Sequence, residues 1–235
     1  MASNFGKTIQ VSTFGTSHGY AIGGIVEGLP CGHTIDIDEL QAFLKRRAPG
    51  QNQLQTQRKE ADIPEFLSGM VDGMLSGSPL AFMIRNTSQH SGDYNNLRDI
   101  PRPSHADFTA RMRYGDKVDM RGGGHFSARL TAPLCVAGGI ALQLLREKGI
   151  EIHGHLKQVG SIQDAPIDMV HPDMQALAHI ATKPIAMVDA NKRTEVENLV
   201  MQLKKDGDST GGIVEVIATG LPVGLGNPNF DGIEN

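Results

Sequence analysis

The sequence predicts a fold of class α+β, in which both helices and strands are present. Residues 8–14 alternate polar and apolar side chains and are rich in β-branched types, and residues 21–26 form a second apolar strand candidate. Residues 36–47, 127–148 and 194–205 instead place apolar side chains at helical spacing. With 235 residues, 39% of them hydrophobic, the chain is long enough to bury a substantial core.

The first two strand candidates are joined by a turn in which Ser17 and His18 lie between Gly15 and Gly19. The simplest local structure is a β-hairpin with His18 at its tip or edge. A histidine near its unperturbed pKa of ~6.5 exchanges a proton at neutral pH, so His18 is a candidate acid or base. Ser17 is placed to orient the ring or to bind a phosphate oxygen. A surface hairpin without catalytic function is an equally good interpretation of this turn.

The first helix is predicted from an aspartate at its start, a shared apolar face and a basic last turn, which suits the helix dipole. That last turn is Lys45-Arg46-Arg47, before Pro49 and Gly50. Arginine binds carboxylates and phosphates because its planar guanidinium can contact two oxygens at once. A solvated helix end is the simpler interpretation of this basic run.

The middle of the chain predicts further strands at 67–75 and 80–84, a polar loop at 51–59 and a long polar stretch at 87–124. A stretch of this length without strong secondary structure in a compact domain is usually functional or disordered. This one contains Arg102 and His105, which favour function.

Three consecutive glycines, Gly122-Gly123-Gly124, precede the second long helix. Glycine lets a backbone approach a ligand closely, and a helix N-terminus offers N–H groups to an anion. The segment is therefore interpreted as a phosphate-accommodating turn. In the helix that follows, six residues are expected to pack inward: Leu134, Ala137, Gly138, Ala141, Leu144 and Leu145.

The last helix is predicted with a capping box formed by Thr194 and Glu197, and Gly207 ends it before a strand at 212–221. His153 and His155 share one face of another probable strand. No third ligand with suitable spacing accompanies them, so a solvated strand face is favoured over a metal site.

Composition excludes several classes of protein. A net charge of −4 argues against a general nucleic-acid binder. Cys31 and Cys135 show no metal-ligand spacing, and we expect no metal. The N-terminus has no apolar signal segment, and we expect no stretch able to span a bilayer. A cytoplasmic protein with no membrane partner is the simplest conclusion.

Six segments, in order along the chain, resemble signatures of the chorismate synthase family. They are TFGTSHG (13–19), RRAPG (46–50), SGDY (91–94), RPSHAD (102–107), RGGGHFSAR (121–129) and the stretch 208–226. The resemblance implies a β-α-β sandwich with helices packed between antiparallel or mixed sheets. It also implies that residues 1–235 form a single domain matching the N-terminal two-thirds of the family, truncated at the C-terminus.

The activity implied is that of a carbon–oxygen lyase of the shikimate pathway of aromatic amino acid biosynthesis. It removes phosphate from 5-enolpyruvylshikimate 3-phosphate by a 1,4-anti-elimination, with reduced FMN and no net redox change. The resemblance makes His18 and His105 catalytic, protonating the departing phosphate and the reduced flavin. It assigns the substrate to Ser17, Arg47 and Arg129, and FMN to Arg47, Gly124, His125, Phe126 and Ser127.

The family also implies a homotetramer, with FMN reduced by NADPH on the enzyme or supplied already reduced. Thr16, Ser104, His125, Phe126 and Leu130 depart from the usual signatures. Two other hypotheses stay open. One is a non-catalytic truncated fragment that folds and oligomerises but cannot hold FMN, and the other is a flavin-independent phosphate-binding module.

Overall fold

The computed structural model describes residues 3–50, 60–87 and 100–226. The predicted loop at 51–59 and the SGDY segment at 91–94 lie outside the described residues. The chain forms two compact units, Met1–Gln143 and Leu144–Asn235, which are described separately below. The single domain expected over residues 1–235 stays a prediction.

Unit 1 contains a five-stranded antiparallel sheet with the strand order β1-β2-β3-β7-β4. Its strands are β1 (Asn4–Phe5), β2 (Gln10–Gly15), β3 (Ala21–Glu27), β4 (Glu65–Ser68) and β7 (Leu80–Arg85). A short hairpin is formed by β5 (Met70–Val71) and β6 (Met74–Leu75). The predicted hairpin of β2 and β3 is confirmed, with Gly15 paired to Ile22 at its closed end.

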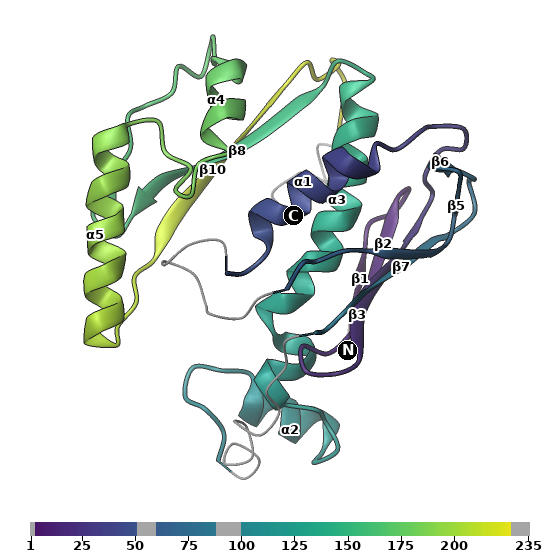
Figure 1. Ribbon diagram of the computed structural model, residues 1–235, viewed down its shortest axis with the longest axis horizontal. Helices are drawn as coiled ribbons and strands as arrows, with labels where there is room; N and C mark the ends of the chain where they lie inside the picture. Colours follow the sequence, from purple (N-terminus) through teal and green to yellow (C-terminus); the bar gives the residue numbers. More distant parts are fainter. Residues whose placement is uncertain (1–2, 51–59, 88–99, 227–235) are drawn as a thin grey trace. The chain divides into compact units, whose positions relative to one another are not determined.

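One face of this sheet is buried, and the helices α1 (Ile37–Arg47) and α3 (Thr131–Arg146) lie on one side of it (Figure 1). The buried sheet side chains alternate along the strands, as the pleat requires: Val11, Ile22, Val26, Leu80, Phe82 and Ile84. Asp36 caps α1 by accepting a hydrogen bond from the Glu39 amide at 2.8 Å. The helix predicted at 36–47 is therefore confirmed.

Unit 2 contains a three-stranded antiparallel sheet with the order β10-β8-β9. Its elements are β8 (Glu151–Val159), β9 (Ile162–Gln163), α4 (Met174–Ile180), α5 (Ala190–Asp206) and β10 (Gly212–Thr219). Leu177 and Ile180 of α4 pack with Ile217 of β10 to form its apolar cluster. Together with unit 1, this confirms the predicted class α+β.

Several predicted elements are corrected by the structure. The strand expected at 67–75 is divided among β4, β5 and β6, because Gly69, Asp72 and Gly73 all take positive φ angles. The polar stretch 87–124 contains a helix, α2 (Asp107–Tyr114). The last helix begins earlier than predicted: Asp189 caps α5, so Thr194 lies inside the helix and forms no capping box.

The helix predicted at 127–148 consists of a 3-10 turn, Ala128–Leu130, followed by α3. Its predicted inward face is only partly right: Leu144 is buried, but Leu134 is 39% exposed, whereas Ala132, Val136 and Ile140, which were not predicted, are fully buried. The helix is apolar nearly all round, so periodicity could not identify the face that packs.

One helix is long and apolar enough to cross a membrane by length and composition alone, and the expectation of no membrane span stays a prediction. The 19 residues Ala128–Arg146 are long and apolar enough, with a mean hydropathy of 1.5 in the most apolar window. Half of that window is buried inside the protein, and an apolar helix in a protein core has the same length and composition.

Candidate active site

The turn that carries His18 is hydrogen-bonded to the three-glycine turn, which lies within the 3-10 segment Arg121–Phe126. The Ser17 amide donates to the Gly124 carbonyl at 3.1 Å, and the Ser17 hydroxyl lies 3.0 Å from the Gly122 carbonyl. His18 is only 8% exposed, so the surface-hairpin interpretation is wrong. The two segments form one structure although a hundred residues of sequence separate them.

The hydrogen bonds of Ser17 fix the tautomer of a neutral His18. The Ser17 hydroxyl has a single proton, and two carbonyls, those of Arg121 and Gly122, lie within 3.2 Å of its oxygen. His18 Nδ1 lies 3.0 Å from the same oxygen and must therefore donate to it. In this tautomer Nε2 carries no proton and is the accepting nitrogen of the ring.

Both candidate histidines lie against consecutive glycines of the turn. A Cβ on Gly122 would lie 2.0 Å from the His18 ring, and a Cβ on Gly123 would lie 3.2 Å from His105 Nε2. All three glycines have positive φ angles, from 55° to 91°. The turn therefore needs glycine both for its backbone conformation and to admit the two imidazoles.

Asp107 orients the second histidine. Its Oδ1 lies 2.7 Å from His105 Nδ1, and its carboxylate also binds Arg102 through Nε and Nη2, each at 2.8 Å. Arg102 holds the pKa of the Asp107 carboxyl well below its usual range, mainly through these hydrogen bonds. The ionised carboxylate therefore accepts the Nδ1 proton of His105, which leaves Nε2 directed at Gly123.

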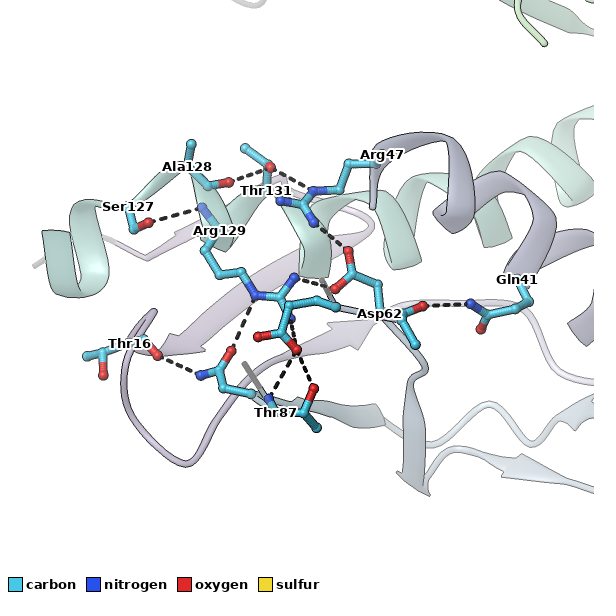
Figure 2. Close-up of polar contacts among 12 residues, drawn as sticks. Thr16, Gln41, Arg47, Asp62, Thr87, Ser127, Ala128, Arg129 and Thr131 are labelled. Atoms are coloured by element: carbon cyan, nitrogen blue, oxygen red, sulfur yellow. Dashed lines mark hydrogen bonds and ion pairs between the residues drawn. The ribbon is translucent and has the colours of Figure 1, made fainter. Parts of the chain in front are cut away.

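Arg47 and Arg129 both bind Asp62 (Figure 2). Arg47 Nη1 contacts Asp62 Oδ2, and Arg129 Nη1 contacts Asp62 Oδ1. Arg47 also donates from Nε to the Thr131 hydroxyl at 3.3 Å. Its side chain is 23% exposed and paired, so the solvated helix end favoured for Lys45-Arg46-Arg47 is wrong for Arg47, whereas Lys45 and Arg46 are exposed.

Arg129 is buried among acidic and amide groups. Its Nη2 lies 4.0 Å from Glu60 Oε2 and has no hydrogen-bond partner among the described residues. Its Nε donates to Asn86 Oδ1 at 3.3 Å. Two arginines face two carboxylates here, so the cluster is close to neutral and retains one buried donor able to bind an anionic oxygen.

Asn86 connects this cluster with the turn of His18. Its Nδ2 donates to the carbonyl of Thr16 at 3.1 Å and to that of Gly19 at 2.9 Å. Its backbone amide donates to the Tyr20 carbonyl at 3.1 Å. The predicted catalytic histidine and the predicted substrate arginine are therefore joined through one side chain.

The residues assigned to FMN by resemblance have mixed surroundings. His125 is engaged at both ring nitrogens, by the Gly15 carbonyl at 2.9 Å and the Ser3 hydroxyl at 2.8 Å. The Ser127 hydroxyl accepts from the Arg129 amide at 3.3 Å. Phe126 is 38% exposed, with its ring 6.5 Å from that of Tyr114. His125 thus fixes the glycine turn to β2, whereas Phe126 keeps exposed surface.

Sequence reasoning missed the groups that hold these residues in place, namely Glu60, Asp62, Asn86, Asp107 and Asp119. Asp107 ends the RPSHAD segment, so its position two residues after His105 was a usable signal. Asp119 binds Arg121 and accepts a hydrogen bond from the Thr16 hydroxyl at 3.2 Å. Thr16, which departs from the usual signature, thus joins the turn of His18 to Asp119. Glu60, Asp62 and Asn86 carry no local pattern, because only the tertiary fold brings them to Arg129.

Among the described residues, no group of three or more histidine, cysteine or acidic side chains could hold a metal ion. The prediction that His153 and His155 share a solvated face is wrong for His155, which is 3% exposed. Its Nε2 lies 3.0 Å from Glu215 Oε2, and its Nδ1 lies 3.7 Å from Asp164 Oδ2.

The fold and the site define an α+β protein with a compact site of two oriented histidines, a glycine turn and buried arginines. The sequence model of one family, described as chorismate synthase, matches residues 9–235. A chorismate synthase of Lancefieldella parvula is 43% identical over 246 residues, covering 100% of this chain and 64% of that protein. One of Ralstonia pickettii is 44% identical over 233 residues, covering 99% of this chain and 61% of that protein.

A crystal structure of chorismate synthase matches with a TM-score of 0.72 at 26% identity, covering 94% of this chain and 60% of the other. The chain belongs to the chorismate synthase family, and the predicted fold of that type is confirmed. It spans 64% and 61% of the length of the two curated relatives named above.

Proposed function

We propose that this protein is a chorismate synthase, which eliminates phosphate from 5-enolpyruvylshikimate 3-phosphate to give chorismate. The observation that carries the proposal is the placement of His18 and His105 against consecutive glycines of one turn. Two proton-exchanging groups beside one turn suit a reaction in which a phosphate leaves and a proton is removed.

The imidazolium form of His18 protonates the departing phosphate from Nε2, and the neutral ring that remains keeps its Nδ1 proton on the Ser17 hydroxyl. Arg129 offers Nη2, its buried donor, to an anionic oxygen of the substrate. Arg47 adds a second guanidinium, 23% exposed and anchored on the same carboxylate. Arginine suits both parts of this substrate, since phosphate and carboxylate each accept its bidentate contacts.

Reduced FMN is the cofactor that the family uses, and it supports this elimination without net redox change. The described residues that fit it are Arg47, Phe126 and the backbone of the turn from Gly124 to Ser127. His125 does not fit a direct contact, because Ser3 and Gly15 occupy both of its ring nitrogens. Because Asp107 accepts the Nδ1 proton of His105, the ring gains and loses its second proton at Nε2.

The test is a titration of this chain with reduced FMN, in the absence and presence of 5-enolpyruvylshikimate 3-phosphate, followed by the flavin spectrum. We expect saturable binding that tightens with substrate, and turnover in an anaerobic assay. No flavin binding under either condition would contradict the proposal and favour the alternative of a fragment that folds but cannot hold FMN. Flavin-independent binding of phosphate would favour a phosphate-binding module.

Family membership extends the proposal to a cytoplasmic homotetramer. Sedimentation of the purified chain tests the tetramer, and oxidation of NADPH in the presence of FMN tests whether the protein reduces its own flavin. A chain that turns over only with chemically reduced FMN would depend on another source of reduced flavin.

A further inference from the structure

We infer that Asn86 is a positioning residue, which sets the place of His18 relative to Arg129. The inference rests on the function proposed above, because it assigns Asn86 to the same site. Asn86 follows the last residue of β7 and is 8% exposed. Its side-chain amide is therefore surrounded by protein groups rather than by water.

The amide of Asn86 matches its surroundings atom by atom. Its two N–H donors meet two carbonyls, Thr16 at 3.1 Å and Gly19 at 2.9 Å. These carbonyls flank the pair Ser17 and His18. The orientation of the amide is fixed by them, because a flipped amide would set its oxygen against both carbonyls.

The oxygen of the same amide is thereby directed at Arg129 Nε, 3.3 Å away. Arg129 is in turn held by Asp62, at the other side of its guanidinium. One planar group thus joins the turn that supplies the proton to the guanidinium that would bind the anion.

Neighbouring groups restrict Asn86 further. The Thr87 amide and hydroxyl donate to Glu60 Oε2 at 3.0 and 2.8 Å, and Glu60 also lies 4.0 Å from Arg129 Nη2. The backbone of Asn86 is tied to Tyr20. The Asn86 side chain therefore cannot move with the turn of His18 if one hydrogen bond between them is lost.

The test compares Asn86→Ala and Asn86→Asp with a matched control, Gln143→Ala. Gln143 is another side-chain amide clamp of unit 1, which accepts from the Asp36 amide at 2.8 Å and donates to the Asp36 carbonyl at 2.9 Å. Gln143 contacts Asp36, the N-cap residue of α1. Gln143→Ala therefore removes an amide that holds a helix end and none of the site residues. Thermal unfolding, the NMR signals of the His18 ring and of Arg129 Nε–H, and the affinity for inorganic phosphate are measured for each variant of the 235-residue chain.

We expect Asn86→Ala to shift the His18 ring signals, to speed exchange of Arg129 Nε–H and to weaken phosphate binding about two- to tenfold, as the loss of one or two hydrogen bonds predicts. Asn86→Asp keeps the oxygen facing Arg129 but places a second oxygen against the two carbonyls. It should shift His18 while leaving Arg129 Nε–H protected. Gln143→Ala should lower the melting temperature and change none of the three site readouts.

Unchanged His18 and Arg129 signals in Asn86→Ala would overturn the inference, whatever happens to the melting temperature. If the wild-type protein binds no phosphate, the proposed function loses support, but the two NMR readouts still decide the role of Asn86. If both variants fail to fold, exchange of the Asn86 Nδ2 protons in the wild-type protein decides it. Slow exchange supports the clamp, and exchange at the rate of a free amide contradicts it.

Discussion

Asp62 binds Arg47 and Arg129 from a left-handed backbone conformation, with φ at 51° and its side chain fully buried. Non-glycine residues in this region are uncommon and aspartate is among those that tolerate it. The two guanidiniums are balanced only as long as both carboxylates, Asp62 and Glu60, are present. The residue is thus a structural centre of the site although no sequence pattern marks it.

Replacing Asp62 by alanine should be severely destabilising. Two arginines would keep their charges after losing their shared carboxylate, and breaking a buried pair in this way costs about 3–5 kcal/mol. The measurement is the free energy of unfolding in urea. Glu65→Gln is the control, because Glu65 and Arg85 form a pair whose side chains are 41% and 45% exposed. An exposed pair contributes about 0–1 kcal/mol, and an equal loss in the two variants would contradict the buried role of Asp62.

Asp107 gives the site a defined dependence on pH. Arg102 lowers its pKa in the folded protein, so the group stabilises the fold above its unfolded pKa of about 3.9. That stabilisation is lost as the pH falls below this value toward the folded pKa. Unfolding free energies measured between neutral pH and the acid range should fall less steeply in Asp107→Asn than in the wild type. Parallel curves would show that Asp107 does not contribute in this way.

At the scale of elements, the sequence predicted what depends on local chemistry. The hairpin of β2 and β3 follows from alternation, and α1 follows from its cap and basic end. The start of α5 was misplaced because Thr194 and Glu197 form a plausible capping pair, whereas the actual cap is Asp189, which accepts from Asn191 N at 2.7 Å. Periodicity failed for α3, whose apolar surface is too wide to show which side is buried.

The contact between α1 and α3 depends on a glycine that the sequence does not distinguish from its neighbour. A Cβ on Gly139 would lie 2.6 Å from Leu40 Cδ1 and 3.1 Å from Phe43 Cδ1, whereas a Cβ on Gly138 would meet nothing within 4 Å. Leu40 is 1% exposed and has little room to move. Close packing against α1 therefore involves Gly139 and not Gly138.

Gly138→Ala and Gly139→Ala form a matched pair of substitutions within one helix. Both gain helix propensity, worth about 1 kcal/mol each, but only the second forces overpacking, which costs about 1–3 kcal/mol. Thermal or urea unfolding should show that Gly138→Ala is the more stable of the two by at least about 1 kcal/mol. Equal stabilities would mean that α1 moves away from α3 without cost.

At the scale of the molecule, every described residue of the candidate site lies in unit 1, from Ser17 to Arg129. The motifs that suggested this site were collinear in sequence, but their joining through Asp62, Asn86 and Asp107 could not be predicted, because it depends on contacts between distant segments. The segment 208–226, also similar to the family, lies in unit 2. Unit 2 has its own apolar cluster and its own buried polar group, around His155.

His155 provides a test of how far the site depends on unit 2. Glu215 faces its Nε2 and Asp164 faces its Nδ1, while Lys157 binds the other oxygen of Glu215 at 2.5 Å. Lys157 and His155 lower the pKa of Glu215, so the carboxylate is ionised at neutral pH and its contribution is lost only as the pH falls into the acid range. His155→Gln removes a ring that faces two carboxylates and should destabilise the protein by about 1–3 kcal/mol.

The same substitution should leave the site unchanged, because no described site residue belongs to unit 2. The His18 ring signals and their response to inorganic phosphate should match those of the wild type, while the free energy of unfolding falls. Lys192→Gln is the control for a surface change in unit 2, since Lys192 pairs only with Glu195 of the same helix among the ion pairs of the described residues. A His155→Gln variant that shifts the His18 signals, with the control silent, would show instead that unit 2 helps to set the geometry of the site.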